Sequence, residues 1–505
     1  MNDKKKRKKG SVDTYIIVFF VVVIAAISTY LIPRGYFETK EVSYKQGTTE
    51  HTKKTLIPDS FQFEKDAEGR PVVKGVGFFR DGNSEDIGFL NFMFEGLVSG
   101  GKWSPAVGLI ALLLIIGGAF GIILRTGSVE TAIFSVAKKI KGYELVLIGV
   151  LFFVFSLGGA IFGMAEETLP FLMVFIPMFL VLGYDSITAI MVVFGASQIG
   201  FATSWMNPFS VAIAQGISQV TVFSGSVFRM LMWLFFTTVV MITTMMYARK
   251  IKKNPKKSIC HETDKEIDFV HSAEAMHNAK MRKGDYVVLV VFFAGIAWVM
   301  WGVATQGYYL PELSTQFFTM GLVIGLLGVI FKLNDMTFNE IPKVFRKGAE
   351  EFLSPAILVA MATSVLIILG GSDPSKPTVL NSILHYAGSA VSDLPTYAAA
   401  WFMYVFQSIF NFFVVSGSGQ AALTMPLLAP ISDMVGVTRQ VAVLAFQLGD
   451  GFTNLIVPTN AILIGILAIA KIEWVRWAKF QLKYQLILFI LGSLFIFLAV
   501  GIGYN

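Results

Sequence analysis

The feature that most constrains this chain is its succession of long apolar segments. About 20 apolar residues of helix are needed to cross the hydrocarbon core of a bilayer. We identify nine such segments, near residues 14–33, 104–125, 186–217, 226–248, 286–304, 316–332, 354–371, 437–470 and 483–503. Charged residues make up only 15% of the chain, too few to cover the surface of soluble domains. The sequence therefore predicts an all-α polytopic membrane protein.

Four of the apolar stretches carry a polar interruption near their middle. Residues 143–184 and 397–435 have the length of helical hairpins that enter and leave by one membrane face. The segments 186–217 and 437–470 exceed thirty residues and contain polar residues around Pro208 or Pro458. Because proline removes a backbone donor, we expect these two transmembrane helices to be broken at mid-membrane.

The distribution of Lys and Arg sets the expected orientation. Six of the first ten residues are basic, which places the N-terminus in the cytoplasm. The first apolar segment ends at Pro33-Arg34 without a small-residue cleavage site, so we interpret it as an anchor and not as a signal peptide. Alternation from there leaves the C-terminus extracytoplasmic and assigns four basic connections to the inside, 125–141, 249–283, 332–347 and 471–483.

These boundaries divide the chain into six parts. In order, they are a cytoplasmic tail with the first span (1–33), an extracytoplasmic loop expected to fold as a small cap (34–103), a first transport repeat (104–248), a cytoplasmic linker (249–285), additional spans (286–353) and a second transport repeat (354–505).

The two transport repeats share residues at a near-constant offset. The matches are Ser104-Pro105-Ala106 with Ser354-Pro355-Ala356, Gly117-Gly118 with Gly370-Gly371, Pro177 with Pro430, Gly183 with Gly436, and Asn207 with Asn460. In the expected orientation the first copy starts outside and the second starts inside. Inverted repeats with broken helices are the usual build of secondary transporters that work by alternating access.

Polar stretches at 156–167, 203–208, 416–420 and 450–460 fall at the expected hairpin turns and helix breaks. Freed amides at helix N-termini attract carboxylates, and freed carbonyls with hydroxyls can surround a sodium ion. We therefore expect sodium near Asn207 and Asn460. The residues that we expect to bind the solute or a coupling ion are Glu166, Glu167, Ser204, Trp205, Asn207, Ser416, Ser418, Gln420, Asp450, Asn454, Thr459 and Asn460.

The acids among these residues have two interpretations. An ionised acid at mid-membrane costs about 2.5 to 3.5 kcal/mol on insertion scales, so Glu166 or Glu167 is expected to hold an ammonium group or a proton. Alternatively, the two glutamates compensate the dipole of the hairpin's second limb. Asp450 either binds a cation or an amine, or caps its helix.

The neutral residues are open to the same choice. Asn207 and Asn460 either bind a substrate carboxylate or cap their half-helices. Ser416 and Ser418 belong either to the site or to a crossing of helices through small residues. Trp205 either stacks on a cation or packs against a neighbour.

Four stretches carry a family resemblance. GMAEETLPF (163–171), QIGFATSWMNPF (198–209), VVSGSGQAALTMPLLAP (414–430) and FQLGDGFTNLIVPTNA (446–461) resemble the YfcC family of basic amino acid antiporters, grouped with DcuC and ArcD-type carriers in the ion transporter superfamily. The resemblance extends over nearly the whole chain. It implies two re-entrant hairpins whose tips move the substrate, in a homodimer in the bacterial inner (plasma) membrane.

Charge favours a cationic substrate. Residues 142–228 contain no Lys or Arg but four acids, and residues 377–470 contain a single Lys or Arg, Arg439. A dianion would meet acids and no paired cation at mid-membrane, unless bound sodium supplied the charge. We predict a secondary carrier of a small amino-acid-like solute, of the arginine/ornithine antiporter type, with no cofactor and with sodium or a proton as the coupling ion.

Three other functions stay open at this point. They are a sodium- or proton-coupled carrier of dicarboxylates, a channel, and an intramembrane aspartyl protease built on Tyr184-Asp185 and Leu448-Gly449-Asp450. A nucleic-acid partner is excluded because the basic residues lie in short blocks between apolar segments. The single cysteine, Cys260, excludes internal disulfides, and the five histidines lack metal-ligand spacing.

Overall fold

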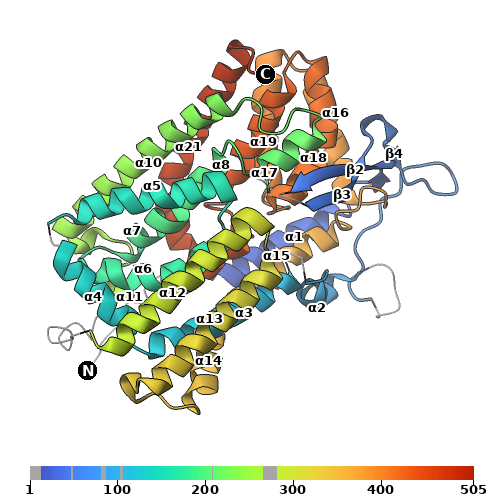
Figure 1. The fold of residues 1–505 in the computed structure, drawn as a ribbon. Helices are drawn as coiled ribbons and strands as arrows, with labels where there is room; N and C mark the ends of the chain where they lie inside the picture. The colour runs from blue at the N-terminus through green and yellow to red at the C-terminus, as the bar shows by residue number, and fades with distance from the viewer. Residues whose placement is uncertain are drawn as a thin grey trace, which may run out of the picture.

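The computed structural model describes residues 13–46, 49–80, 87–102, 106–140, 142–207, 209–265 and 281–505, and these are mostly helical (Figure 1). Six helices are long and apolar enough to cross a membrane: α3 (Val107–Arg125), α5 (Glu144–Phe162), α10 (Ser226–Lys253), α12 (Lys283–Trp301), α13 (Leu310–Ile330) and α21 (Trp474–Gly501). A bent pair, α14 (Glu340–Glu350) and α15 (Leu353–Ile368), makes a seventh with a 43° bend.

One of these seven, α5, was predicted as a hairpin limb, so the seven account for six of the nine predicted spans. The other three predicted spans differ for two reasons. The first predicted span, α1 (Thr14–Ser28), has 15 described helical residues. Two other segments are each divided into shorter helices, as their polar interruptions predicted. The first consists of α7 (Ser186–Ile190), a π-helical turn at Met191–Gly195, α8 (Ala196–Ala202) and α9 (Val211–Ile217). The second consists of α19 (Arg439–Thr453) and α20 (Ala461–Ile469).

Pro458 falls in the second interruption, between α19 and α20. Pro208 lies outside the described residues, as do the basic residues of the N-terminal tail.

Both predicted hairpins are present. The first pairs α5 with α6 (Thr168–Val181), and the second pairs α17 (Thr396–Phe410) with α18 (Gly417–Met434). Gly163 ends α5 with φ at 72°, a conformation in which a side chain would be strained. In each half the hairpin precedes a broken helix and then a 28-residue helix, α10 or α21. The order of elements therefore recurs, while the inversion of one copy relative to the other stays a prediction.

Several matched residues occupy equivalent places in the two halves. Gly183 and Gly436 both follow the second hairpin limb with positive φ, 83° and 72°. Pro177 and Pro430 both lie inside that limb, in α6 and α18.

The match of Gly117-Gly118 with Gly370-Gly371 is wrong as a structural equivalence. Gly117 lies inside α3, where a Cβ would come within 2.6 Å of the Gly348 carbonyl oxygen of α14. Gly370 and Gly371 instead follow the end of α15, with φ at 103° and 84°.

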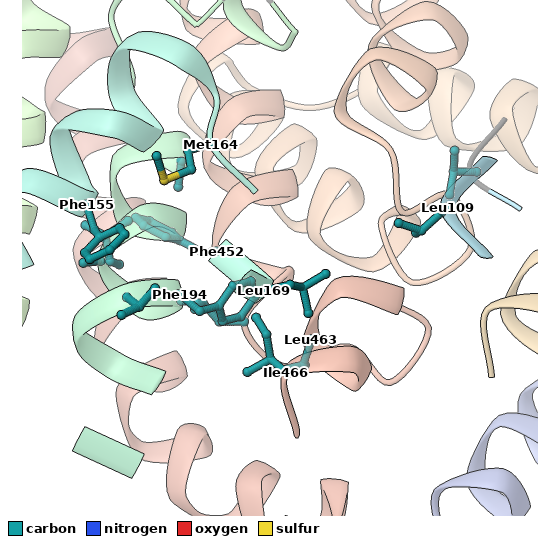
Figure 2. Packing of buried hydrophobic residues seen from close by; sticks show 14 of the residues in the cluster. Leu109, Phe155, Met164, Leu169, Phe194, Phe452, Leu463 and Ile466 are labelled. Carbon is teal, nitrogen blue, oxygen red and sulfur yellow. The ribbon is translucent and has the colours of Figure 1, made fainter. Parts of the chain in front are cut away.

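The hairpins pack on the broken helices through glycine. A Cβ on Gly200 of α8 would lie 1.8 Å from the Ser156 carbonyl oxygen of α5, so the two backbones touch. A Cβ on Gly449 of α19 would lie 2.6 Å from Gln407 Cβ of α17. The second limb packs through larger side chains, and Leu169 of α6 points toward Leu463 and Ile466 of α20 (Figure 2).

The predicted cap contains two small antiparallel sheets. One pairs β1 (Gly35–Tyr36) with β4 (Gln62–Phe63), the other pairs β2 (Thr39–Gln46) with β3 (Thr49–Leu56), and α2 (Phe92–Val98) packs on α15. The cap is joined to the segment before α16 (Val379–Ser392), because the Phe37 amide donates to the Pro374 carbonyl oxygen at 2.8 Å. Short 3₁₀ turns occur at Pro58–Ser60, Phe89–Asn91, Pro255–Lys257 and Leu333–Asp335, and a π-helical turn at Gly302–Gln306.

Segments assigned to the same face contact one another. The Arg125 guanidinium, at the end of α3, pairs with the Glu340 carboxylate at 3.0 Å. Arg439, at the start of α19, donates to the carbonyl oxygen of Ser218, directly after α9, at 2.9 Å. Four of the described helices fall in connections for which the sequence suggested none: α4 (Ser128–Ile140), α11 (His261–Asp264), α14 and α16. Which face is cytoplasmic stays a prediction.

Candidate functional site

A cavity of about 560 Å³ lies where the hairpin turns and the helix breaks meet. Its walls come from both hairpin turns, from α8 and the end of the first break, from the second break, and from α3, α15 and the residues before α13. No Lys, Arg or His is found among the described residues that line it. Seven of the predicted site residues line the cavity, namely Glu166, Glu167, Ser416, Ser418, Asn454, Thr459 and Asn460. The structure thus brings together residues almost 300 positions apart.

The two glutamates lie in the first hairpin turn and have different surroundings. Glu167 is 6% exposed, directly precedes α6 and accepts a hydrogen bond from the Ala165 amide at 3.0 Å. This hydrogen bond stabilises the turn, and the place of Glu167 directly before α6 is also compatible with compensation of the helix dipole. Glu166 is half-buried, and the Tyr309 hydroxyl lies next to its carboxyl group. Of the two acids, Glu166 is the one better placed to meet a solute.

Tyr309 is a site residue that the sequence reasoning missed. It directly precedes α13, in the part of the chain described only as additional spans. Its ring stacks on Phe209 of the first break, with centroids 6.2 Å apart. Tyr309 and Phe209 both line the cavity, so the spans between the repeats contribute to the site.

The second break is organised by amide side chains. Asn460 Oδ1 accepts from the Ile462 and Leu463 amides at 2.9 and 3.2 Å, so Asn460 caps α20. Its Nδ2 donates to the Asn454 carbonyl oxygen at 3.0 Å, and Asn454 Oδ1 accepts from Asn411. In this conformation the capping interpretation holds for Asn460, while the residue also forms part of the cavity wall.

The second hairpin turn places a helix N-terminus at the cavity. Ser416 caps α18, its hydroxyl oxygen accepting from the Gly419 amide at 3.3 Å. The first residues of α18, Gly417 to Gly419, line the cavity. Helix N-termini carry partial positive charge from unsatisfied amides and attract carboxylates. The cavity therefore has acids at one hairpin turn and the positive end of a helix at the other.

The first break supplies residues that support the site from outside the cavity. The Ser204 hydroxyl donates to the Ala160 carbonyl oxygen at 2.6 Å and accepts from the Asn207 amide at 2.8 Å. Asn207 Oδ1 accepts from the Phe209 amide at 2.8 Å. Trp205 lies against Trp233, with ring centroids 4.9 Å apart. None of Ser204, Trp205 and Asn207 is among the described residues that line the cavity.

Gln420 and Asp450 lie behind the second hairpin turn. Gln420 Nε2 donates to Gln407 Oε1 at 2.7 Å, which ties α18 to α17. Asp450 is fully buried, and neither of its carboxylate oxygens has a hydrogen-bond partner in the part of the chain that the structure describes.

Arg229 is a second residue that the charge argument overlooked. Arg229 comes directly after residues 142–228, the stretch that contains no Lys or Arg. Its side chain is fully buried in α10. Its guanidinium donates to the side-chain oxygens of Gln447 and Gln440, and Gln447 donates in turn to the Ser204 carbonyl oxygen at 2.7 Å. The sequence contained a signal for this residue, because an isolated Arg in an apolar helix by default indicates a functional role. Arg229 does not line the cavity, so the wall itself keeps its acidic character.

Within the described ranges, no group of three or more His, Cys, Asp or Glu side chains could hold a metal ion. The described cavity wall offers carboxylates, hydroxyls, amide groups and a helix end.

Residues 12–501 match the profile of a transport family described as "DcuC: C4-dicarboxylate anaerobic carrier". The chain belongs to this family. It is also 45% identical over 503 residues, 99% of each chain, to the Escherichia coli (strain K12) protein named "Putative basic amino acid antiporter YfcC", which confirms the resemblance found in the sequence. An uncharacterized protein of Haemophilus influenzae is 26% identical over 522 residues, again 99% of each chain.

Two solved structures of transporters are similar over most of their length. They are the YdaH transporter of Alcanivorax borkumensis (TM-score 0.39, 16% identity, covering 97% of this chain and 98% of that one) and MtrF of Neisseria gonorrhoeae (TM-score 0.39, 15% identity, 97% and 95%). The family and the relative named as an antiporter make the chain a multi-pass membrane transporter of a small solute.

Proposed function

We propose that this transporter is an antiporter of basic amino acids, of the arginine/ornithine type. The observation that carries the proposal is the cavity wall, which presents Glu166 and Glu167 and, in its described part, no basic side chain. A cationic solute lowers the cost of burying these carboxylates, because opposite charges compensate each other where water is excluded.

The carboxylate of an amino acid would also have a binding partner in this cavity. Ser416 and Gly417 start α18 at the cavity, and Asn460 starts α20 there. A substrate carboxylate at these helix N-termini would meet the partial positive charge of two helix ends. The ammonium and side-chain cation would then lie toward Glu166. A volume of about 560 Å³ lies within the range of small-molecule sites.

The carrier works by alternating access in the bacterial inner membrane, as a homodimer with a cytoplasmic N-terminus. Support for movement comes from the two hairpins and two broken helices, whose half-helix ends converge on one central cavity. The segments that the basic connections assign to one face also contact each other, as Arg125 and Glu340 do.

The family description and the name of the 45% identical relative disagree on the substrate class, dicarboxylate or basic amino acid. A dicarboxylate would place two negative charges beside Glu166 and Glu167, and like charges at close range oppose binding. Dicarboxylate transport through this cavity would therefore need a bound cation or protonated glutamates.

The experiment that tests the substrate class is competition in proteoliposomes. Purified protein is reconstituted, and uptake of labelled arginine is measured against unlabelled arginine, ornithine, lysine, succinate and fumarate. We expect the three basic amino acids to compete and the two dicarboxylates to have no effect. Competition by succinate or fumarate, with none from ornithine or lysine, would contradict the proposal.

A further inference from the structure

Asp450 is the buried acid whose surroundings the solute cavity does not explain. It lies on α19 near the second break, is fully buried, and has no hydrogen-bond partner on either carboxylate oxygen within the described residues. Buried polar atoms in native proteins almost always have a partner, so an acid with two unpartnered oxygens requires a specific cause.

The fold buries Asp450 through glycines on both sides of it. A Cβ on Gly451 would lie 2.4 Å from Ala202 Cα of α8, and one on Gly449 would lie 2.6 Å from Gln407 Cβ of α17. These approaches press α19 against both neighbouring helices. On a third side, a Cβ on Gly417 would lie 3.1 Å from Asp450 Oδ2. Because Gly417 lines the cavity, the carboxylate lies directly behind the cavity wall.

The described groups that contact this carboxylate carry no opposite charge. A Cβ built on Gly417 would also lie 3.2 Å from Phe201 Cζ and 3.6 Å from Ser210 Cβ. The Ser210 hydroxyl is buried and has no hydrogen-bond partner among the residues that the structure describes. Asn411 Nδ2 donates to the main-chain oxygen of Asp450 at 3.0 Å, and the Asn454 side chain also approaches the carboxyl. Thus α8, α9, α17, α18 and the end of α19 present neutral side chains in these contacts.

An unpaired ionised carboxylate in such a place is strongly unfavourable, whereas a neutral acid or one that binds a cation is not. A sodium ion needs about five or six oxygen ligands by analogy with other hard cations. The described contacts supply the two oxygens of Asp450, the hydroxyl of Ser210 and the side chain of Asn454, which is fewer than sodium requires. A proton needs only one oxygen. We propose that Asp450 is the proton-binding site of this transporter, separate from the solute cavity and coupled to it through Gly417.

The coupling follows from the shared wall. In the closed arrangement Asp450 is sealed and holds a proton. When the turn at Ser416 and Gly417 moves to admit or release solute, water reaches the carboxylate and the proton can leave to that side. Since solute and proton both favour particular positions of this turn, each changes the affinity for the other. Exchange of one monocation for one proton then moves no net charge.

This inference rests on the proposed antiport, so its test separates the two. Proteoliposomes containing a pH-sensitive dye are used to count protons moved per arginine during net arginine transport. Arginine-for-ornithine exchange is measured in the same vesicles. We expect a fixed proton-to-arginine ratio in the wild type and a ratio of zero in D450N, whatever transport rate remains. The control D393N removes an exposed acid and is expected to keep the wild-type ratio.

The outcomes distinguish the two claims. Absence of any arginine transport in the wild type contradicts the proposed function. Arginine transport with an unchanged proton ratio in D450N, or with a sodium requirement in place of proton movement, overturns the role of Asp450. If D450N does not fold, infrared spectroscopy of wild-type protein carrying ¹³C-labelled aspartate tests whether a protonated aspartic acid is present. A protonated aspartic acid band at pH 7.5 supports the inference, and its absence overturns it.

Discussion

At the residue scale, adjacent acids in one turn have different tasks. Glu167 accepts a hydrogen bond from the Ala165 amide and helps to define the turn. Glu166 is half-buried beside Tyr309 and lines the cavity. The sequence could place both glutamates at the hairpin turn, because the glycines before them and the apolar limbs around them are local features. It could not assign their roles, because those depend on a tyrosine that is distant in the chain.

We predict that Glu166→Gln weakens binding of arginine about ten- to a hundredfold, since hydrogen bonds to charged groups contribute about 1.5 to 3 kcal/mol. Isothermal titration of the detergent-purified protein measures the change. Glu350→Gln removes an exposed acid at the end of α14 and serves as the control. Wild-type affinity in Glu166→Gln would show that this carboxylate does not contact the solute.

Arg229 shows how a residue can be overlooked although a signal is present. Arg229 comes directly after residues 142–228, which contain no Lys or Arg, and a single Arg in an apolar helix already indicated a polar partner inside the protein. Its partners, Gln440 and Gln447, lie more than 200 positions away, so no local pattern could have named them.

At the element scale, glycines set the distances between the hairpins and the broken helices. The sequence predicted the hairpins and the breaks because glycine, proline and polar residues stand out in apolar segments. It mispaired Gly117-Gly118 with Gly370-Gly371, because a glycine at a helix crossing and a glycine after a helix end look alike until φ is known. The helix α14 was missed because its amphipathic segment lies in a basic connection.

Gly200→Ala is expected to destabilise the packing of α8 on α5, because the added methyl would lie 1.8 Å from the Ser156 carbonyl oxygen. Overpacking of this kind costs about 1 to 3 kcal/mol. The measurement is the thermal unfolding midpoint in detergent, which should fall. The matched control is Gly101→Ala, where a Cβ would meet no atom within 4 Å. Equal midpoints for the two variants would argue against the close contact.

The linker between the two halves, residues 249–285, is held against the start of α7 by specific contacts. The Ser186 hydroxyl at the start of α7 donates to Asp264 Oδ1 at 2.5 Å, and Ser258 donates to Asp185 Oδ2 at 2.7 Å. Burial raises the pKa of Asp264 to about 6; hydrogen bonds from Ser186 oppose this change, and the Asp185 carboxylate adds to it. The ordinary pKa of an aspartate in an unfolded chain is about 3.9.

A raised pKa means that docking of the linker binds a proton. The stabilisation is complete below about pH 4 and is lost as the pH rises through about 6. We therefore predict larger hydrogen-exchange protection factors for residues 256–264 at pH 5 than at pH 7.5. In Asp264→Asn this difference should disappear. Equal protection at both pH values in the wild type would contradict the prediction.

At the scale of the whole molecule, two units with the same order of elements enclose one cavity, and the spans between them add Tyr309 to its wall. The chain belongs to a carrier family, and its cavity pairs acids with helix N-termini. These features together favour a solute that carries a carboxylate and more than one cationic group. We therefore propose that basic amino acids are exchanged through one site.

The most direct measurement is trans-stimulation in proteoliposomes. Entry of labelled arginine is compared between vesicles loaded with ornithine and vesicles loaded with buffer alone, over a range of outside concentrations. We predict saturable entry that is at least tenfold faster with ornithine inside. Entry that does not saturate and is equally fast in empty vesicles would contradict an antiporter.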